Sequence, residues 1–226
     1  MTRRELYGLL ISILVFTLAA MLPFVNTGYG LSLGVTIAMY TVLSTSWSLF
    51  SGPTHYISLA TAAFFGLGMY VVGAGLSLFP FPVLVVIAAA VGALLAGLIG
   101  LATLRLSGVY FVIFTLGLSE LIRQLVTWFQ TTMGTSSGLY VLTNVDEKTI
   151  YWQLLILAIF TYFIGWWINR SRLGFALRII GNDEEVAAHS GINTALVKIF
   201  LFMISGSIAA TTGAVLAPRW TYIEPT

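Results

Sequence analysis

Long apolar runs separated by short polar breaks make up almost the whole chain. A helix that crosses the hydrocarbon core of a bilayer needs about 20 mostly apolar residues. On that criterion the sequence predicts spans near residues 6–25, 29–50, 57–78, 82–104, 109–131, 150–168 and 195–217. We therefore expect one all-α domain over residues 1–226, folded as a polytopic transmembrane helix bundle of about seven spans.

The third apolar run is the least regular of the seven. Residues that favour breaks in a helix occur in it and just before it: Gly52, Pro53, Gly66, Gly68 and Gly73. Non-helical backbone at membrane depth is tolerated where protein encloses it. A continuous glycine-rich span and a discontinuous one both fit this pattern, so the sequence leaves the continuity of residues 52–78 open.

The basic residues predict the orientation, because cytoplasmic loops of membrane proteins are enriched in lysine and arginine. With seven spans and the N-terminus inside, seven basic residues are cytoplasmic: Arg3, Arg4, Arg105, Arg170, Arg172, Arg178 and Lys198. Lys148 and Arg219 then lie outside, and Arg123 is embedded. This bias predicts a cytoplasmic N-terminus and a cytoplasmic loop over residues 169–193.

That loop is the most polar stretch of the chain and contains a pattern typical of a short helix. Asn182 is a predicted N-cap, and three acidic residues that complement a helix N-terminus follow it: Asp183, Glu184 and Glu185. Gly191 is predicted to end the helix. We interpret it as a docking helix for a soluble partner, with Ala187 and Ala188 in the contact surface. The alternative is a solvated loop whose arginines only follow the inside bias.

Two opposite charges, Glu120 and Arg123, fall inside the fifth apolar run. They lie three residues apart on one helix face and can pair. A lone arginine at the bilayer centre costs at least about 2.5–3.5 kcal/mol on insertion scales, so each residue neutralises the other. The sequence favours a structural ion pair, and a role in a translocation path is the alternative.

Composition narrows the function classes further. The chain is 58% hydrophobic and 8% charged, with a mean hydropathy of +0.98, far from the roughly 25% charged content of soluble domains. A net charge of +2 offers no nucleic-acid footprint. The chain has no cysteine and only two histidines, His55 and His189, so no metal or cofactor is expected. No phosphate-binding loop or acid–base set occurs, so we expect no enzyme, and any ATP hydrolysis belongs to another protein.

Three blocks carry a resemblance to one family. Residues 185–191 (EVAAHSG) resemble the E-A-A-x-x-x-G loop of bacterial ABC importer permeases. Residues 52–68 (GPTHYISLATAAFFGLG) are similar to the glycine-rich segment of LivM-type branched-chain amino-acid permeases, and residues 104–123 (LRLSGVYFVIFTLGLSELIR) to their central helix. The blocks occur in family order, and the resemblance covers roughly residues 35–225.

The resemblance implies a permease subunit that moves branched-chain amino acids or a similar small polar solute across the bacterial inner membrane. It implies cytoplasmic ATP-binding subunits, a second homologous permease subunit and a periplasmic solute-binding protein as partners, besides the lipid bilayer. Candidate residues of the ATPase-coupling loop are Arg178, Asp183, Glu184, Glu185, Ala187, Ala188 and Gly191. Candidates for the translocation path are Ser58, Thr61, Ser119, Glu120 and Arg123.

Two departures from the family pattern limit this interpretation. The family commonly has S-L-G-H where this chain has Ser58-Leu59-Ala60-Thr61, so that position says little about the solute. Family members typically continue with further helices beyond the last span seen here, and we therefore expect a truncated chain. The competing class is an ion-coupled secondary transporter that uses Glu120 and Arg123 as a relay and needs no docking helix.

Overall fold

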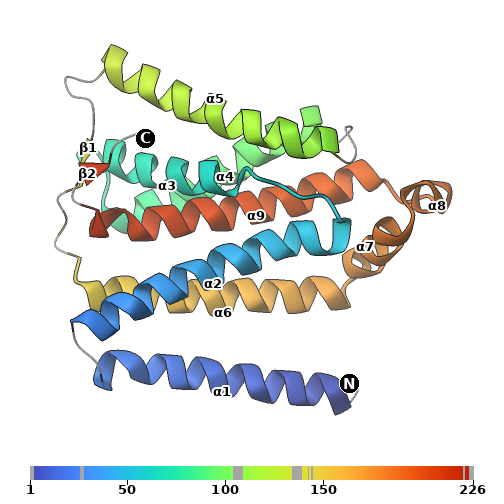
Figure 1. Cartoon of the computed structure of the whole chain (residues 1–226), viewed down its shortest axis with the longest axis horizontal. Coiled ribbons are helices and arrows are strands. Elements are labelled where there is room, and N and C mark those ends of the chain that lie inside the picture. Colours follow the sequence, from blue (N-terminus) through green and yellow to red (C-terminus); the bar gives the residue numbers. More distant parts are fainter. Residues whose placement is uncertain are drawn as a thin grey trace.

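The chain folds into a bundle of roughly parallel and antiparallel helices (Figure 1). The computed structural model describes residues 3–25, 28–103, 109–133, 139–141, 143, 145–220 and 222–223. Its helices are α1 (Arg3–Val25), α2 (Tyr29–Thr54), α3 (Thr61–Gly75), α4 (Phe81–Thr103), α5 (Val109–Met133), α6 (Glu147–Arg170), α7 (Arg172–Asn182), α8 (Glu184–His189), α9 (Thr194–Leu216) and the 3₁₀ turn η1 (Ala217–Arg219). Two short strands, β1 (Leu139–Tyr140) and β2 (Tyr222–Ile223), pair antiparallel.

Among the described residues, five helices are long and apolar enough to cross a membrane: α2, α4, α5, α6 and α9. Helices α1 and α3 run alongside them and contain shorter apolar stretches, Leu10–Val25 and Thr61–Gly75. The chain is a multi-pass membrane protein with an all-helical bundle, as its sequence predicts. The count of about seven spans stays a prediction.

The third apolar run is discontinuous. Helix α2 continues through Pro53 to Thr54, and His55 then takes a left-handed conformation with φ 58° and ends the helix. Residues 55–60 are not helical, and α3 begins only at Thr61 and has 15 residues. The continuous alternative for residues 52–78, and a helical start at residue 57, are therefore wrong.

The non-helical segment 55–60 finds hydrogen-bond partners in neighbouring helices. The Trp47 indole N–H donates to the Ser58 carbonyl at 2.9 Å. The Leu59 N–H donates to Thr115 Oγ1 at 3.2 Å, and the Ser119 hydroxyl donates to the Leu59 carbonyl at 3.1 Å. An unsatisfied backbone group in hydrocarbon costs several kcal/mol, so these side chains make the break tolerable at membrane depth.

Helix α9 is the central element and packs mainly against α4 and α3, then α2. Its small-residue face, Ser205, Ala209, Gly213 and Ala217, is buried. A Cβ on Gly213 would overlap the Phe65 carbonyl of α3, and one on Gly68 would overlap the Ala210 carbonyl of α9. Small residues thus let the two backbones touch, as they do in many membrane bundles.

Helix α4 uses a small-residue face one position away from the one its sequence suggests. Ala89, Ala93 and Gly97 repeat every four residues, but Ala89 and Ala93 are only half-buried. The buried row against α9 is Ala88, Gly92, Ala96 and Gly100. Both rows consist of small residues, so spacing alone does not distinguish the two faces.

The two ends of the bundle carry different structures. The N-terminus of α1, α7 and α8 lie at one end, and β1, β2 and the described C-terminal part lie at the other (Figure 1). This places the N-terminus and the 169–193 loop at the same end of the bundle, as an even number of crossings between the N-terminus and α7 requires. At the opposite end Arg219 donates to Ser32 and lies 3.8 Å from Glu147. Arg105 lies outside the described residues.

Candidate functional site

The 169–193 loop folds into two helices rather than one. Helix α7, which the sequence did not predict, is capped by Ser171, whose hydroxyl accepts from the Leu173 N–H at 3.2 Å. It buries Gly174, Ala176, Leu177 and Ile180 against the bundle. Arg172, Phe175 and Arg178 remain exposed. Because α7 packs against the bundle, it fixes the position at which α8 begins.

Helix α8 has a defined cap at each end, and its N-cap is one residue later than predicted. Asp183 is the N-cap, with Oδ1 accepting from the N–H groups of Glu185 (2.9 Å) and Val186 (3.2 Å), whereas Asn182 ends α7. At the other end Gly191 has φ 78°. The Gly191 N–H donates to the Ala188 carbonyl and the Ile192 N–H to the Ala187 carbonyl, which is the Schellman arrangement.

The faces of α8 differ from the predicted contact surface in one respect. Ala187 is 0% exposed and faces the bundle, so it cannot touch a soluble partner. Its neighbours Glu185, Val186, Ala188 and His189 are exposed. A docking surface on α8 therefore consists of these four side chains, and we call it the outer face of α8.

Glu184 anchors α8 to the bundle. Its carboxylate lies 2.5 Å from the Lys198 ammonium of α9 and accepts from the Tyr56 hydroxyl at 2.9 Å. Lys198 also donates to the Tyr56 hydroxyl at 3.2 Å and lies over the Tyr56 ring, 4.5 Å from its centre. Partial burial alone would raise the pKa of the Glu184 carboxyl, but the bonds from Lys198 and Tyr56 outweigh burial and hold that pKa below its ordinary value.

Tyr56 and Lys198 are the residues that sequence reasoning missed. Lys198 is only 2% exposed. The orientation argument from the sequence counts it among the basic residues of the cytoplasmic side, with no further role. A signal was present in the sequence, because Lys198 falls inside the predicted span 195–217. A charge enclosed in a span requires a partner, and the nearest acidic residues in the chain are those of the coupling loop.

The anchor continues to α5 through the non-helical segment. Tyr56 contacts Glu184 at one end of this segment, and Leu59 is bonded to Thr115 and Ser119 of α5 at its other end. Ser119 precedes Glu120 directly in the chain. A continuous series of hydrogen bonds and covalent links therefore joins α8 to the helix that carries the embedded charges.

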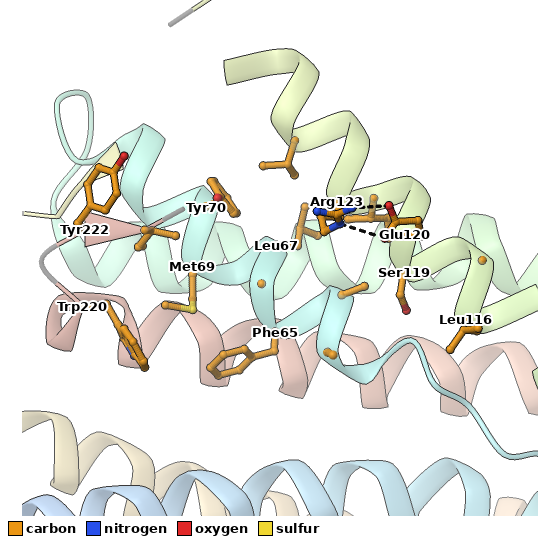
Figure 2. Close-up of a pocket in the computed structure, with 17 residues that line it drawn as sticks. Phe65, Leu67, Met69, Tyr70, Leu116, Ser119, Glu120, Arg123, Trp220 and Tyr222 are labelled. Atoms are coloured by element: carbon orange, nitrogen blue, oxygen red, sulfur yellow. Dashed lines mark hydrogen bonds and ion pairs between the residues drawn. The ribbon is translucent and has the colours of Figure 1, made fainter. Parts of the chain in front are cut away.

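Glu120 and Arg123 form a two-point ion pair within α5. Arg123 Nη2 and Nε lie 2.6 and 2.9 Å from the Glu120 carboxylate oxygens. The pair does not bridge two helices. Both side chains are about half exposed, and they project from α5 toward α3 into a cavity of about 1030 Å³ (Figure 2). Trp220 and Tyr222 line one end of this cavity, here called the α3/α5 cavity.

The five path candidates do not share one cavity. Ser119, Glu120 and Arg123 line the α3/α5 cavity. Thr61 lines a second cavity of about 780 Å³ on the other side of α3, together with α2 residues such as Thr36, Thr41 and Ser44, which sequence reasoning did not single out. Ser58 lines neither and is buried in the non-helical segment, where its hydroxyl accepts from the Ala60 N–H.

Arg178, placed with the coupling residues from the sequence, lies away from the outer face of α8. It borders a crevice of about 470 Å³ between α1, α2, α6 and α7, next to Arg170. Its guanidinium donates a long bond of 3.5 Å to the Asn169 carbonyl. Among the described residues no group of histidine or acidic side chains has the geometry to hold a metal ion.

Comparisons with known proteins show the family of the chain. The profile of a family described as branched-chain amino acid transport system / permease component matches residues 29–226. The chain is similar to the high-affinity branched-chain amino acid transport system permease protein LivM of Escherichia coli (strain K12), at 23% identity over 253 aligned residues, 96% of this chain and 58% of that protein. The LivM protein of Salmonella typhimurium (strain LT2) is 23% identical over 248 residues, 93% of this chain and 57% of that protein.

A shorter similarity reaches a sugar permease. The L-arabinose transport system permease protein AraH of Escherichia coli (strain K12) is 34% identical over 61 residues, which is 27% of this chain and 19% of that protein. The chain thus spans less than two thirds of the length of each of these relatives. No solved structure gives a significant match.

Proposed function

We propose, from the premise that this chain belongs to the family of permease components of branched-chain amino acid transport systems, that it is a permease subunit of an ATP-driven importer of the ABC class. It acts in the bacterial inner membrane with its N-terminus in the cytoplasm. Its solute is a branched-chain amino acid or a similar small polar molecule. The relatives named LivM support that solute class, while the one named AraH shows that related chains serve other solutes.

The observation that carries this proposal is helix α8. It projects beyond the end of the bundle, has a cap at each end, and exposes Glu185, Val186, Ala188 and His189 (Figure 1). A solvated loop needs no such caps and no anchor in the membrane part. We assign the outer face of α8 as the surface that binds a cytoplasmic ATP-binding subunit.

The anchor of α8 supplies a route by which that subunit acts on the membrane part. A force on α8 reaches α9 through Glu184 and Lys198, and it reaches segment 55–60 through Tyr56. From Leu59 it passes to Thr115 and Ser119 of α5 and so to the wall of the α3/α5 cavity. Coupling of this kind needs discrete contacts between rigid elements, and each of these contacts joins two different elements.

The remaining partners and the solute path follow from the same proposal. Two ATP-binding subunits, a second homologous permease and a periplasmic solute-binding protein complete the importer. Ser119, Glu120 and Arg123 form the candidate path on one side of α3, and Thr61 belongs to the second cavity on its other side. Ser58 supports the path indirectly, by stabilising the non-helical segment.

Docking is tested with Ala188→Arg, which places bulk and charge on the outer face of α8. A misplaced charge at an interface costs several kcal/mol, so we expect binding to the cognate ATP-binding subunits to weaken by at least about tenfold. Membrane levels should stay unchanged, because Ala188 is exposed. Co-purification and uptake in reconstituted vesicles measure the effect.

Two matched substitutions control this experiment. Thr149→Arg adds the same charge to an exposed position near the start of α6, at the opposite end of the bundle, and should leave binding intact. Ala187→Arg forces a charge into a buried site and should lower membrane levels instead. Full ATPase binding and uptake in the Ala188→Arg protein would remove α8 from the interface. Solute uptake by this chain alone, driven by an ion gradient, would establish the secondary-transporter alternative.

A further inference from the structure

Two glycines on the walls of the α3/α5 cavity differ from the glycines that pack the bundle. Gly66 lies on α3 and Gly117 on α5, and both line this cavity. Outside their own helical turns, no described atom lies within 4 Å of the position that a Cβ on either of them would occupy. At Gly68, two residues after Gly66 on the same helix, a Cβ would overlap the Ala210 carbonyl of α9. Gly68 therefore serves helix packing, whereas Gly66 and Gly117 leave space open.

A glycine inside a helix needs a compensating role, because glycine weakens a helix relative to alanine. Close backbone contact supplies that role at Gly68. No contact from the described residues supplies it at Gly66 or Gly117. Gly117 precedes Glu120 by three residues, so the two share one face of α5 and line the same cavity. The role that remains for the two glycines is the space that they leave in this cavity.

Gly66 lies at the level of the ion pair on the opposite wall. The Ser119 hydroxyl is bonded to the Leu59 carbonyl just before α3 starts, and α3 and α5 run in the same direction from there (Figure 1). Gly66 is five residues into α3, and Arg123 is four residues beyond Ser119. At 1.5 Å per residue both positions lie about 6–8 Å further along their helices. The open glycine of α3 and the charges of α5 therefore border the same part of the cavity.

The cavity beside the pair combines charge with mostly apolar walls. Arg123 uses Nε and Nη2 for Glu120, so other N–H groups of its guanidinium remain for an ionised group of a solute. Leu67, Leu116 and Val126 are among the apolar side chains of the walls. This combination fits a solute that has an ionised end and an apolar body.

We propose, on the basis of the transport function above, that Gly66 and Gly117 leave the space that receives the apolar part of the solute beside the Glu120–Arg123 pair. The two glycines thereby limit the size of the solutes that the α3/α5 cavity accepts. A side chain at either position would project into that space and would exclude large solutes before small ones. Size selection within the membrane part is thus assigned to two positions.

Thermal unfolding in detergent distinguishes open glycines from packing glycines. Gly66→Ala and Gly117→Ala should unfold at the same or a higher temperature than the unchanged protein, because alanine favours a helix and its Cβ meets no neighbour there. Gly68→Ala is the matched comparison and should lower the unfolding temperature, because its Cβ meets the α9 backbone. If Gly66→Ala and Gly117→Ala are as unstable as Gly68→Ala, both glycines serve packing and the proposal is overturned.

Size selection itself is measured as ATP-driven uptake of alanine and of leucine by the reconstituted importer with its cognate subunits and binding protein. We expect Gly66→Leu and Gly117→Leu to lower the ratio of leucine to alanine uptake at least about fivefold, since one methylene in an enclosed pocket changes discrimination about tenfold or more and this cavity is half open. The same binding protein is present in every assay, so its preference cancels in the comparison with the unchanged protein. Ala90→Leu adds equal bulk at an exposed position of α4 outside the cavity and should leave the ratio unchanged.

The outcomes separate this proposal from the proposed function. Normal protein levels with an unaltered uptake ratio in Gly66→Leu and Gly117→Leu would overturn the size role and leave the transport function intact. Gly66→Ala and Gly117→Ala, with an expected change of about twofold, replace the leucine variants if those are poorly expressed. If the unchanged protein takes up neither amino acid when ATP is supplied, the proposed function and the size role both fail.

Discussion

The Glu184–Lys198 pair and the Glu120–Arg123 pair join the same kinds of groups but differ in what they hold together. The first connects α8 with α9, and its cation is enclosed by protein, with 2% of the side chain exposed. The second lies within α5, and its two side chains remain 50% and 46% exposed beside a cavity. Burial and the number of elements joined therefore decide how much a given ion pair contributes to the fold.

This contrast in burial indicates which pair stabilises the fold and which is available for another role. Loss of a partner from an enclosed charge is costly, because no water replaces it. A pair that faces a cavity retains access to water or solute, so its loss costs the fold little. The first pair is thus expected to affect stability and coupling, and the second to affect what occupies the α3/α5 cavity.

The largest effect should come from Glu184→Gln, which leaves the enclosed Lys198 charge beside a neutral amide and the Tyr56 hydroxyl, without an anion. Breaking a buried pair costs about 3–5 kcal/mol, and the partial exposure of Glu184 reduces this to about 2 kcal/mol. Thermal unfolding in detergent should show this loss. Lys198→Met should be milder, since the 39% exposed Glu184 side chain can turn to water. Equal losses of thermal stability in Glu184→Gln and Lys198→Met would show that the difference in burial between the two side chains does not determine the cost.

Lowering the pH should reproduce part of that effect in the unchanged protein. The pKa of Glu184 lies below its ordinary value of 4.5 in the folded chain, so the pair stabilises the fold above pH 4.5. This contribution is lost as the pH falls through the lowered pKa. The stability difference between the unchanged protein and Glu184→Gln should therefore shrink below pH 4.5. A difference that is constant from pH 7 to pH 3.5 would contradict this assignment.

A smaller effect is expected for Tyr56→Phe, which keeps the ring under the Lys198 ammonium but removes the hydroxyl that Glu184 accepts from. One hydrogen bond to a charged group contributes about 1.5 kcal/mol, and the ion pair itself remains. We expect a loss of about 1 kcal/mol in thermal unfolding and reduced coupling of ATP hydrolysis to uptake. Unimpaired coupling would remove segment 55–60 from the transmission route.

The smallest effect on the fold is expected at the exposed pair. Glu120→Gln and Arg123→Gln should each lower thermal stability less than Tyr56→Phe does, and the double variant should lower it less than either single variant. Protein levels and thermal unfolding measure the cost, and uptake assays measure the function. A double variant that is stable but inactive assigns the pair to the solute path. If the single variants cost as much as Glu184→Gln, the comparison between the two pairs fails.

The sequence predicted the elements that depend on local signals. The apolar runs correspond to the long helices, and Gly191 ends α8 because only a residue that tolerates positive φ fits there. The N-cap was placed at Asn182 instead of Asp183 because both residue types cap helices well. Asp183 is the N-cap because α7 extends to Asn182. Helix α7 itself is stabilised mainly by packing its apolar face against the bundle.

The sequence could not predict which side of a short element faces the bundle. Ala187 and Ala188 are identical in chemistry, and only the contacts of α8 show that the first is buried and the second exposed. The same ambiguity applies to α4, where the adjacent rows that begin at Ala88 and Ala89 both consist of small residues and only the contacts identify the Ala88 row as the buried one. Long-range pairing was equally hidden, since Tyr56 and Glu184 are 128 positions apart. Each of these errors concerns a tertiary contact. Tertiary contacts produce no periodic pattern in a single sequence.

The break between α2 and α3 has a consequence for how α5 moves. The Leu59 N–H and carbonyl groups are bonded to Thr115 and Ser119, one helical turn apart on α5. If α5 separated from the bundle, the Leu59 N–H and carbonyl groups would both lose these partners. We therefore expect α5 to rotate about Leu59 as a fixed pivot, so that one wall of the cavity turns while its point of attachment stays in place.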